Sequence, residues 1–241
     1  MKNTANDIYK LLLDVVSVAS ITDQPEEKTF PHFLKEKLSG WDYFRKNPQN
    51  LWLDALEGDI HKRGNFCALV KAVPATKRTL LLISHHDVVS VEMCAGVGAS
   101  PFEPEKYTQT LHGYALPEEA KVDLNSGEWL FGRGVSDMKG GMAVQLGLLA
   151  EYAENPEKAP ANIRLMTLAD EENNGFGVHQ AVRMLAQMQE EEGYDYIACI
   201  DSEPTITNEG KGNGRIYTGS IGNATLFAMC VGKNSHVGEY F

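Results

Sequence analysis

The sequence predicts an α/β protein, a three-layer αβα sandwich with a mostly parallel sheet. The first observation is a set of short apolar runs with the length of buried strands, at residues 65–72, 79–84, 162–169 and 196–200. The second is that stretches with apolar residues at helical spacing alternate with these runs, which favours a parallel sheet covered on both faces. The third is that acids or histidines directly follow three of the runs, where open α/β sheets bind their ligands.

The helical segments are identified by the spacing of their apolar side chains. The first set lies on one face of a helix and consists of Ile8, Leu11, Leu12, Val15 and Val16. The same spacing recurs further along the chain. We expect helices at residues 4–19, 26–38, 138–152 and 178–188.

Two further segments have a different character. Residues 92–127 contain glycine, proline and charge without clear periodicity, which predicts a long loop, and long loops in compact domains are often functional. A new strand pair is expected over residues 216–231. We therefore divide the chain into a large first domain, residues 1–215, and the beginning of a second, residues 216–241.

Composition and charge exclude several classes of protein. The 241 residues are 43% apolar and 23% charged, which is ordinary for a globular protein. The formal net charge of −11 repels phosphate backbones and anionic lipid surfaces, so we expect neither nucleic acid nor a membrane as partner. The N-terminus has no unbroken apolar stretch with a cleavage site, and no run is long enough to span a membrane. These features predict a cytoplasmic protein.

The four cysteines are scattered along the chain without a CxxC pair. Cys67, Cys199 and Cys230 lie in apolar runs that resemble strands. We therefore expect buried free thiols rather than disulfides or a thiolate zinc site. Cys94 lies in the expected long loop and is assigned no role.

Histidines and acids are concentrated at the ends of three expected strands. His85 and Asp87 follow one strand, Glu171 and Glu172 follow the next, and Glu203 follows the third. The carboxyl ends of parallel strands meet at one edge of a sheet, so these side chains should converge. Like charges in close proximity are costly unless a cation neutralises them. Imidazole with several carboxylates suits a divalent ion of the zinc type, with manganese or cobalt as alternatives.

Each of these patterns has a simpler interpretation when taken alone. His85 and Asp87 could be hydrogen-bonded neighbours in a solvated loop. The acidic run at 170–172 is typical of a helix N-terminus, where acids meet the macrodipole favourably. Asp201 and Glu203 could serve as caps or salt-bridge partners. A metal-independent α/β protein with solvated loop ends is therefore an alternative, although the conjunction of the patterns favours a metal site.

Four motifs resemble those of the di-zinc aminoacylase, succinyl-diaminopimelate desuccinylase and glutamate carboxypeptidase family. Their sequences in this chain are HHDVV at 85–89, GRGVSDMKGG at 132–141, DEE at 170–172 followed by Gly175, and EPT at 203–205. The second match is long and very specific. Trp52 and the GKNSHVG stretch at 232–238 are similar to the arginine-utilisation RocB branch. The resemblance implies a phosphorylase/hydrolase-like fold with an inserted α+β lid, which also forms the dimer.

The resemblance also implies a set of metal ligands. Two Zn²⁺ ions, or Mn²⁺ or Co²⁺ in their place, would be bound by His85, Asp137, Glu172 and Glu203. His85 and Glu203 would bind the first ion, with Asp201 as the second choice for the carboxylate. Glu172 would bind the second ion, and Asp137 would bridge both. The peptide bond after Asp137 would be cis.

Two further acids would act without binding metal. Asp87 would lie behind His85 and orient its imidazole. Glu171 would be the general base, which takes a proton from water and passes it to the leaving amine. The chain would accordingly be a metallopeptidase or amidohydrolase. Its substrate would be a small peptide or an N-acyl amino acid, attacked at the amide bond by a metal-bridged hydroxide.

His236 is the last histidine of the chain. The resemblance implies a lid histidine that reaches the partner subunit's site and stabilises the oxyanion, and the alternative is an ordinary surface histidine. This implies a homodimer when full length, with residues 1–215 as the metal-binding catalytic domain and 216–241 as the start of the lid. The family takes its last metal ligand from a later histidine, which this sequence does not contain. A truncated or degenerate member, acting as an inactive binding or interaction module, is therefore the alternative function.

Overall fold

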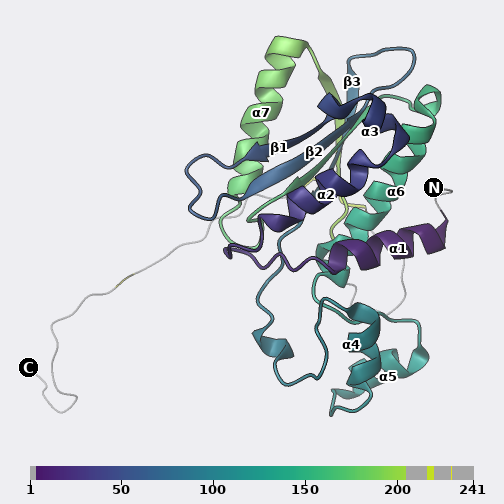
Figure 1. The fold of residues 1–241 in the computed structure, drawn as a ribbon, viewed down its shortest axis with the longest axis vertical. Helices are drawn as coiled ribbons and strands as arrows, with labels where there is room; N and C mark the ends of the chain where they lie inside the picture. The colour runs from purple at the N-terminus through teal and green to yellow at the C-terminus, as the bar shows by residue number, and fades with distance from the viewer. Residues whose placement is uncertain (1–3, 205–215, 220–228, 230–241) are drawn as a thin grey trace, which may run out of the picture. The chain divides into compact units, whose positions relative to one another are not determined.

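A computed structural model describes residues 4–204, 216–219 and 229 of the chain. Its centre is a five-stranded sheet with the strand order β1-β2-β4-β3-β5 (Figure 1). The strands are β1 Leu51–Ala55, β2 Gly64–Val70, β3 Arg78–His85, β4 Asn162–Leu168 and β5 Asp195–Asp201. The four apolar runs of the sequence correspond to β2, β3, β4 and β5, and β1 is an additional strand.

The sheet is mostly parallel, as predicted. β4 and β5 each pair in parallel with β3. β2 is antiparallel to both β1 and β4, so β1 runs in the direction of the other three. The parallel register places His85 at the end of β3 beside Leu168 at the end of β4. The carboxyl ends of β3, β4 and β5 therefore meet at one edge of the sheet.

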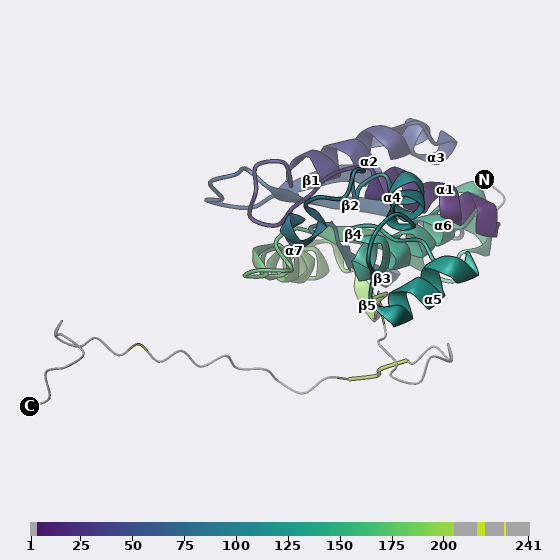
Figure 2. The same ribbon diagram turned by 90° about the horizontal axis from the view of Figure 1, so that it is seen from below.

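Helices cover both faces of this sheet, which confirms the α/β class. Their bounds are α1 Ala5–Val16, α2 Thr29–Ser39, α3 Asp42–Lys46, α6 Gly141–Glu154 and α7 Phe176–Glu192. α1, α2, α3 and α6 form one layer and pack on the sheet around Phe30, Leu146 and Leu165. α7 covers the opposite face and packs on Cys67 and Met166 (Figure 2). Neighbouring residues on β2 and β4 thus point to different layers, as the pleat of a strand requires.

The expected long loop at 92–127 contains two helices instead. These are α4 Pro104–Leu111 and α5 Glu118–Ser126. They share a small apolar cluster of Tyr107, Leu111 and Leu124, which is separate from the two clusters on the sheet. Helices of eight and nine residues offer too few apolar positions to produce a recognisable period. For this reason the sequence pattern did not distinguish them from a loop.

β5 also differs from the buried strand that the sequence predicts. It is the last strand in the sheet order and pairs only with β3 among the residues that the structure describes. Ile197 and Ile200 are consequently 42% and 45% exposed. Cys199 is exposed too, which contradicts the expected buried thiol, whereas Cys67 is a fully buried free thiol. Cys230 lies outside the described residues.

The chain divides by its internal contacts into Met1–Pro204 and Thr205–Phe241. Within the second unit, residues 216–219 and 229 are described, and they belong to no helix or strand. The rest of the strand pair expected at 216–231 lies outside the described residues, and the predicted boundary at residue 215 stays a prediction. In the described part of the chain, no helix is both long and apolar enough to cross a bilayer.

Candidate metal centre

The ends of three strands and one turn bring polar side chains together at the carboxyl edge of the sheet. His85 ends β3, Glu171 and Glu172 follow β4, and Glu203 follows β5. Asp137 lies in the turn Val135–Gly140, which leads into α6. The ligand atoms of His85, Glu171 and Glu203 lie within 4.8 Å of one another. Those of His85, Asp137 and Glu172 satisfy the same limit, so His85 is common to both groups.

The imidazole of His85 is fixed with Nε2 directed at the carboxylates. Its Nδ1 lies 2.9 Å from the backbone carbonyl oxygen of Asp87 and, as the donor of that hydrogen bond, carries the proton. Nε2 lies 3.0 Å from Oδ1 of Asp137 and 3.4 Å from Oε1 of Glu203. It lies 3.9 Å from Oε2 of Glu171. Once Nε2 is deprotonated, an imidazole held in this way presents its Nε2 lone pair to a metal ion.

The carboxylate of Asp87 has a different principal contact from the one expected. Its Oδ1 is 3.6 Å from Nδ1 of His85, and it is the backbone carbonyl of Asp87 that accepts the imidazole proton. The carboxylate instead accepts the backbone N–H groups of Glu171, at 3.1 Å, and Glu172, at 3.0 Å. Asp87 thus connects the end of β3 to the loop after β4. Burial raises the pKa of Asp87, but the adjacent His85 and His86 and these N–H donors hold it below its ordinary value.

Asp137 is placed by a turn that is anchored in the protein interior. The Asp137–Met138 peptide bond is cis, as the resemblance implies. Gly134 begins the turn at φ 76°, a left-handed conformation that favours glycine. The buried ammonium of Lys139 donates to the backbone carbonyl of Val18 at 2.8 Å and to the hydroxyl of Ser20 at 2.9 Å. These contacts hold the turn against the segment that follows α1.

Glu203 is placed by contacts between α6 and the end of β5. The side-chain amide of Gln145 on α6 donates to the carbonyl of Ile83 at 2.7 Å and to the hydroxyl of Ser202 at 2.9 Å. Gly141, at the start of α6, approaches the backbone of Ser202 so closely that a β-carbon there would lie 2.0 Å from its carbonyl oxygen. A glycine at this point allows the helix to reach the residue that precedes Glu203.

The electrostatics of the cluster favour a cation. Burial, with the neighbouring Asp137 and Asp201, raises the pKa of Glu203 to about 7, although His85 opposes the shift. Burial and other carboxylates also raise the pKa values of Glu171 and Glu172. Burial lowers the pKa of His85. The surrounding carboxylates raise it by a larger amount, so that the pKa of His85 lies at about 10. Four carboxylates around one imidazole therefore need positive charge, and their oxygen and nitrogen atoms are donors that suit zinc-type ions.

The match to known families agrees with this geometry. A family model described as peptidase family M20/M25/M40 matches residues 81–219, which is more than half of the chain. The matched span includes all five side chains of the cluster. The chain belongs to the M20/M25/M40 peptidase family. The family that the sequence motifs indicated is thereby confirmed.

Three curated proteins are similar to most or nearly all of the chain. Protein RocB of Bacillus subtilis is 31% identical over 238 residues, which cover 98% of this chain and 42% of RocB. Protein YqjN of the same organism is 34% identical over 241 residues, or 99% of this chain and 43% of YqjN. A succinyl-diaminopimelate desuccinylase of Xanthomonas campestris is 23% identical over 202 residues, which cover 84% of this chain and 44% of that enzyme. The chain therefore spans less than half the length of these relatives.

Solved structures share the fold of this M20 chain. The dipeptidase Dug1p of Saccharomyces cerevisiae aligns with a TM-score of 0.54 at 14% identity and covers 84% of this chain and 42% of Dug1p. Human carnosine dipeptidase 1 aligns with a TM-score of 0.52 at 17% identity and covers 82% of this chain and 38% of that protein. These similarities show the fold of the described sheet and helices.

Two buried charges near the M20 cluster, Arg63 and Glu27, lie outside the sequence motifs, and a third, Asp170, is the first residue of the DEE motif. Arg63, Glu27 and Asp170 are at most 3% exposed and contact one another. No pattern in the sequence predicts that these three residues contact one another, because they come from three separate segments of the chain. His86 is buried against the ring of Phe30, and within the part of the chain that the structure describes it belongs to neither group of possible metal ligands. His236 lies outside the described residues.

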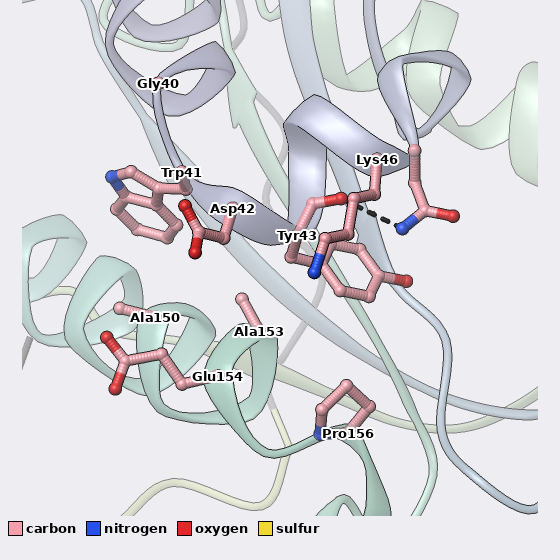
Figure 3. Close-up of a pocket in the computed structure, with 10 residues that line it drawn as sticks. Gly40, Trp41, Asp42, Tyr43, Lys46, Ala150, Ala153, Glu154 and Pro156 are labelled. Carbon is pink, nitrogen blue, oxygen red and sulfur yellow. Dashed lines mark hydrogen bonds between the residues drawn. The ribbon is translucent and has the colours of Figure 1, made fainter.

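A separate cavity of about 700 Å³ lies between α3 and the end of α6. Figure 3 shows Trp41, Tyr43 and Lys46 on one side of it, facing Ala153 and Glu154. None of the residues that line it belongs to the M20 metal cluster. The cluster therefore lies at the sheet edge, away from this cavity.

Proposed function

We propose that the chain carries the metal-binding part of a hydrolase that cleaves the amide bond of a small peptide or an N-acyl amino acid. The observation that carries this proposal is the convergence of His85 Nε2 with four carboxylates at the carboxyl edge of a parallel sheet. Membership of the M20/M25/M40 family supports the reaction class. The names of the dipeptidases and of the desuccinylase support the substrate class by analogy.

The proposal places two divalent ions among these side chains, whose two groups of possible ligands share His85. His85 and Glu203 would hold one ion, Glu172 would hold the other, and Asp137 would contact both. Zinc is the first choice, because one imidazole and several carboxylates match its donors, with manganese and cobalt as alternatives. Bound ions of this kind polarise the scissile carbonyl and make water easier to deprotonate.

Glu171 would be the general base of the reaction. Its carboxylate would accept a proton from the attacking water and then deliver it to the nitrogen of the leaving amine. Its side chain is 51% exposed, so water and substrate can reach it, while its backbone N–H is fixed by Asp87. Asp87 would hold His85 through its carbonyl oxygen and the backbone of Glu171 and Glu172 through its carboxylate.

The remaining predictions concern parts of the molecule that the structure does not describe. We propose that residues 216–241 begin a lid that forms a homodimer. His236 would stabilise the oxyanion in the partner subunit's site. The cytoplasmic location likewise stays a prediction from the sequence.

The proposal is tested by turnover of a panel of dipeptides and of N-acetyl and N-succinyl amino acids. The chain is first stripped with a chelator and then reloaded with zinc, manganese or cobalt. We expect hydrolysis that disappears on chelation and returns with metal. A chain that binds metal but hydrolyses no member of the panel would support the alternative of an inactive binding module.

A further inference from the structure

We propose that Arg63 is a positioning residue for the loop that carries Glu171 and Glu172. It would act through two buried acids, Glu27 and Asp170. The inference rests on the proposed function for the roles of Glu171 and Glu172. Its structural basis is a separate set of contacts, outside the metal cluster.

Arg63 lies directly before β2 and contacts three carboxylates at once. Its Nη1 donates to Oε2 of Glu27 at 3.0 Å and to Oδ1 of Asp170 at 2.6 Å. Its Nη2 and Nε donate to Oδ1 of Asp59 at 2.7 and 3.0 Å. Glu27 and Asp170 are 0% exposed, so their charges are removed from water. Because buried acids repel one another, Arg63 is what allows them to lie together.

Asp170 is the residue directly before Glu171, and it shapes the loop. Its φ of 65° is a left-handed conformation that is uncommon for residues other than glycine, so surrounding contacts have to maintain it. Its Oδ2 accepts the backbone N–H of Phe176 at 3.2 Å, at the start of α7. Its carbonyl oxygen accepts the N–H of Gly175 at 2.7 Å. Asp170 therefore closes the loop from 170 to 176, and its other carboxylate oxygen contacts Arg63.

Three successive backbone N–H groups of this loop are held by acids that lie outside it. The N–H of Asp170 donates to Oε1 of Glu27 at 2.8 Å. The N–H groups of Glu171 and Glu172 donate to the two carboxylate oxygens of Asp87. Asp87 fixes the loop from the side of the metal cluster, and Glu27 fixes it from the side of Arg63. These contacts hold the backbone segment from which the side chains of Glu171 and Glu172 project.

The positions of the three acids require an arginine at residue 63, and another cationic side chain such as lysine would not suffice. A planar guanidinium offers five N–H donors in a fixed arrangement, and Arg63 uses them toward three separate acids. The ammonium of a lysine is a compact point charge at the end of a flexible chain and cannot hold all three in the same positions. An Arg63→Lys variant therefore keeps the charge and loses much of the positioning.

The test compares Arg63→Met and Arg63→Lys with an Arg164→Met control in the 241-residue chain. Arg164 is a matched control because it is also a buried arginine, 1% exposed, and it contacts Tyr196 and the ring of Tyr194 rather than the loop. The first measurement is amide hydrogen exchange at residues 170–172 in metal-free protein. The second is zinc affinity by chelator competition, with the visible spectrum of the cobalt form as a report on ligand geometry.

We expect Arg63→Met to accelerate exchange of these three amides by about tenfold or more relative to the amides of β4. Zinc affinity should fall by about 10- to 100-fold, as when other groups that orient metal ligands are lost. Arg63→Lys should lie between the parent and Arg63→Met in both measurements. The Arg164→Met control should match the parent at these amides and in zinc affinity, even if it unfolds at a lower temperature.

The proposal would be overturned if Arg63→Met had the same amide exchange rates at residues 170–172 and the same zinc affinity as the parent. If that variant does not fold, Arg63→Lys decides the question, and parent values there would overturn it as well. If Arg164→Met accelerated amide exchange at residues 170–172 as much as Arg63→Met does, the effect would be a general loss of stability. That result would also count against the proposal. If the parent itself binds no zinc, the proposed function fails, whereas the exchange measurement still tests the role of Arg63.

Discussion

Glu171 and Glu172 are adjacent in the chain, yet their carboxylates belong to different groups. Glu171 is close to His85 and Glu203, and Glu172 is close to His85 and Asp137. Distance alone would permit either glutamate to bind metal. The proposed assignment gives the half-exposed Glu171 the role of base, because a base has to meet both the water and the leaving amine. This assignment can be tested at the level of single residues.

Glu171→Gln preserves the size of the side chain and removes its ability to accept the proton. We expect kcat to fall by about 10²- to 10⁴-fold, the usual contribution of a general base, while metal content stays at the parent value. Steady-state kinetics and elemental analysis on the same samples measure both quantities. Loss of a metal ion from this variant would show that Glu171 is a ligand.

Glu27 gives a prediction for the pH dependence of stability. Burial raises its pKa to about 7 from an ordinary value of 4.5, although the hydrogen bond from Arg63 opposes this. Between these two values the folded state holds the proton more tightly than the unfolded state does. The contribution of Glu27 to stability is therefore present below pH 4.5 and is lost as the pH rises through 7.

A Glu27→Gln variant removes this titration. We expect the free energy of unfolding of the parent, relative to the variant, to decrease by about 3 kcal/mol between pH 4.5 and 8. Chemical unfolding across this range measures the difference. A constant or increasing difference would show that Glu27 stays ionised beside Arg63 throughout.

At the scale of elements, the site depends on how α6 meets the sheet. The turn before α6 carries Asp137, and the first turns of α6 contact the end of β5, which leads to Glu203. Two proposed ligands that are distant in the chain, Asp137 and Glu203, are thus placed by one helix. The close approach of α6 to the backbone of Ser202 depends on Gly141. The φ of Gly141 is −61°, which is ordinary for a helix, so a side chain at this position would be unfavourable only because of steric overlap.

Gly141→Ala should therefore move α6 away from Ser202 and displace Glu203. We expect destabilisation of about 1–3 kcal/mol, as for other overpacked positions, together with weaker metal binding. Gly40→Ala is the matched control, since its β-carbon would make an ordinary 3.4 Å contact at the end of α2. Thermal unfolding and metal titration of both variants measure the effects. If the two variants had the same thermal stability and the same metal affinity, the approach of α6 to Ser202 would not be needed for stability or for metal binding.

Elements also show where a sequence pattern stops being informative. The strands that carry the motifs are seven or eight residues long, and each contains a shorter apolar run that indicates a strand. The short helices α4 and α5 have few apolar positions and were mistaken for a loop. β5 is exposed because it is the last strand in the sheet formed by the described residues, and strand order is not encoded in a local pattern.

At the scale of the whole molecule, the sequence predicted which side chains converge better than it predicted the contacts that support them. A parallel sheet brings strand ends together, so motifs at those ends indicated that His85, Glu171, Glu172 and Glu203 lie close to one another. The contacts of Arg63 join residues that are 36 and 107 positions apart, and nothing local signals them. The contact of the Asp87 carboxylate with the loop 84 residues later was missed for the same reason.

Metal content per chain measures whether this chain assembles a two-metal site. The parent, Glu172→Ala and Glu190→Ala are loaded with zinc, desalted and measured by elemental analysis. Glu190 is an exposed glutamate of α7 and serves as the control. We expect about two ions in the parent and in the control, and about one in Glu172→Ala. One ion or none in the parent, or no difference between the two variants, would contradict the account.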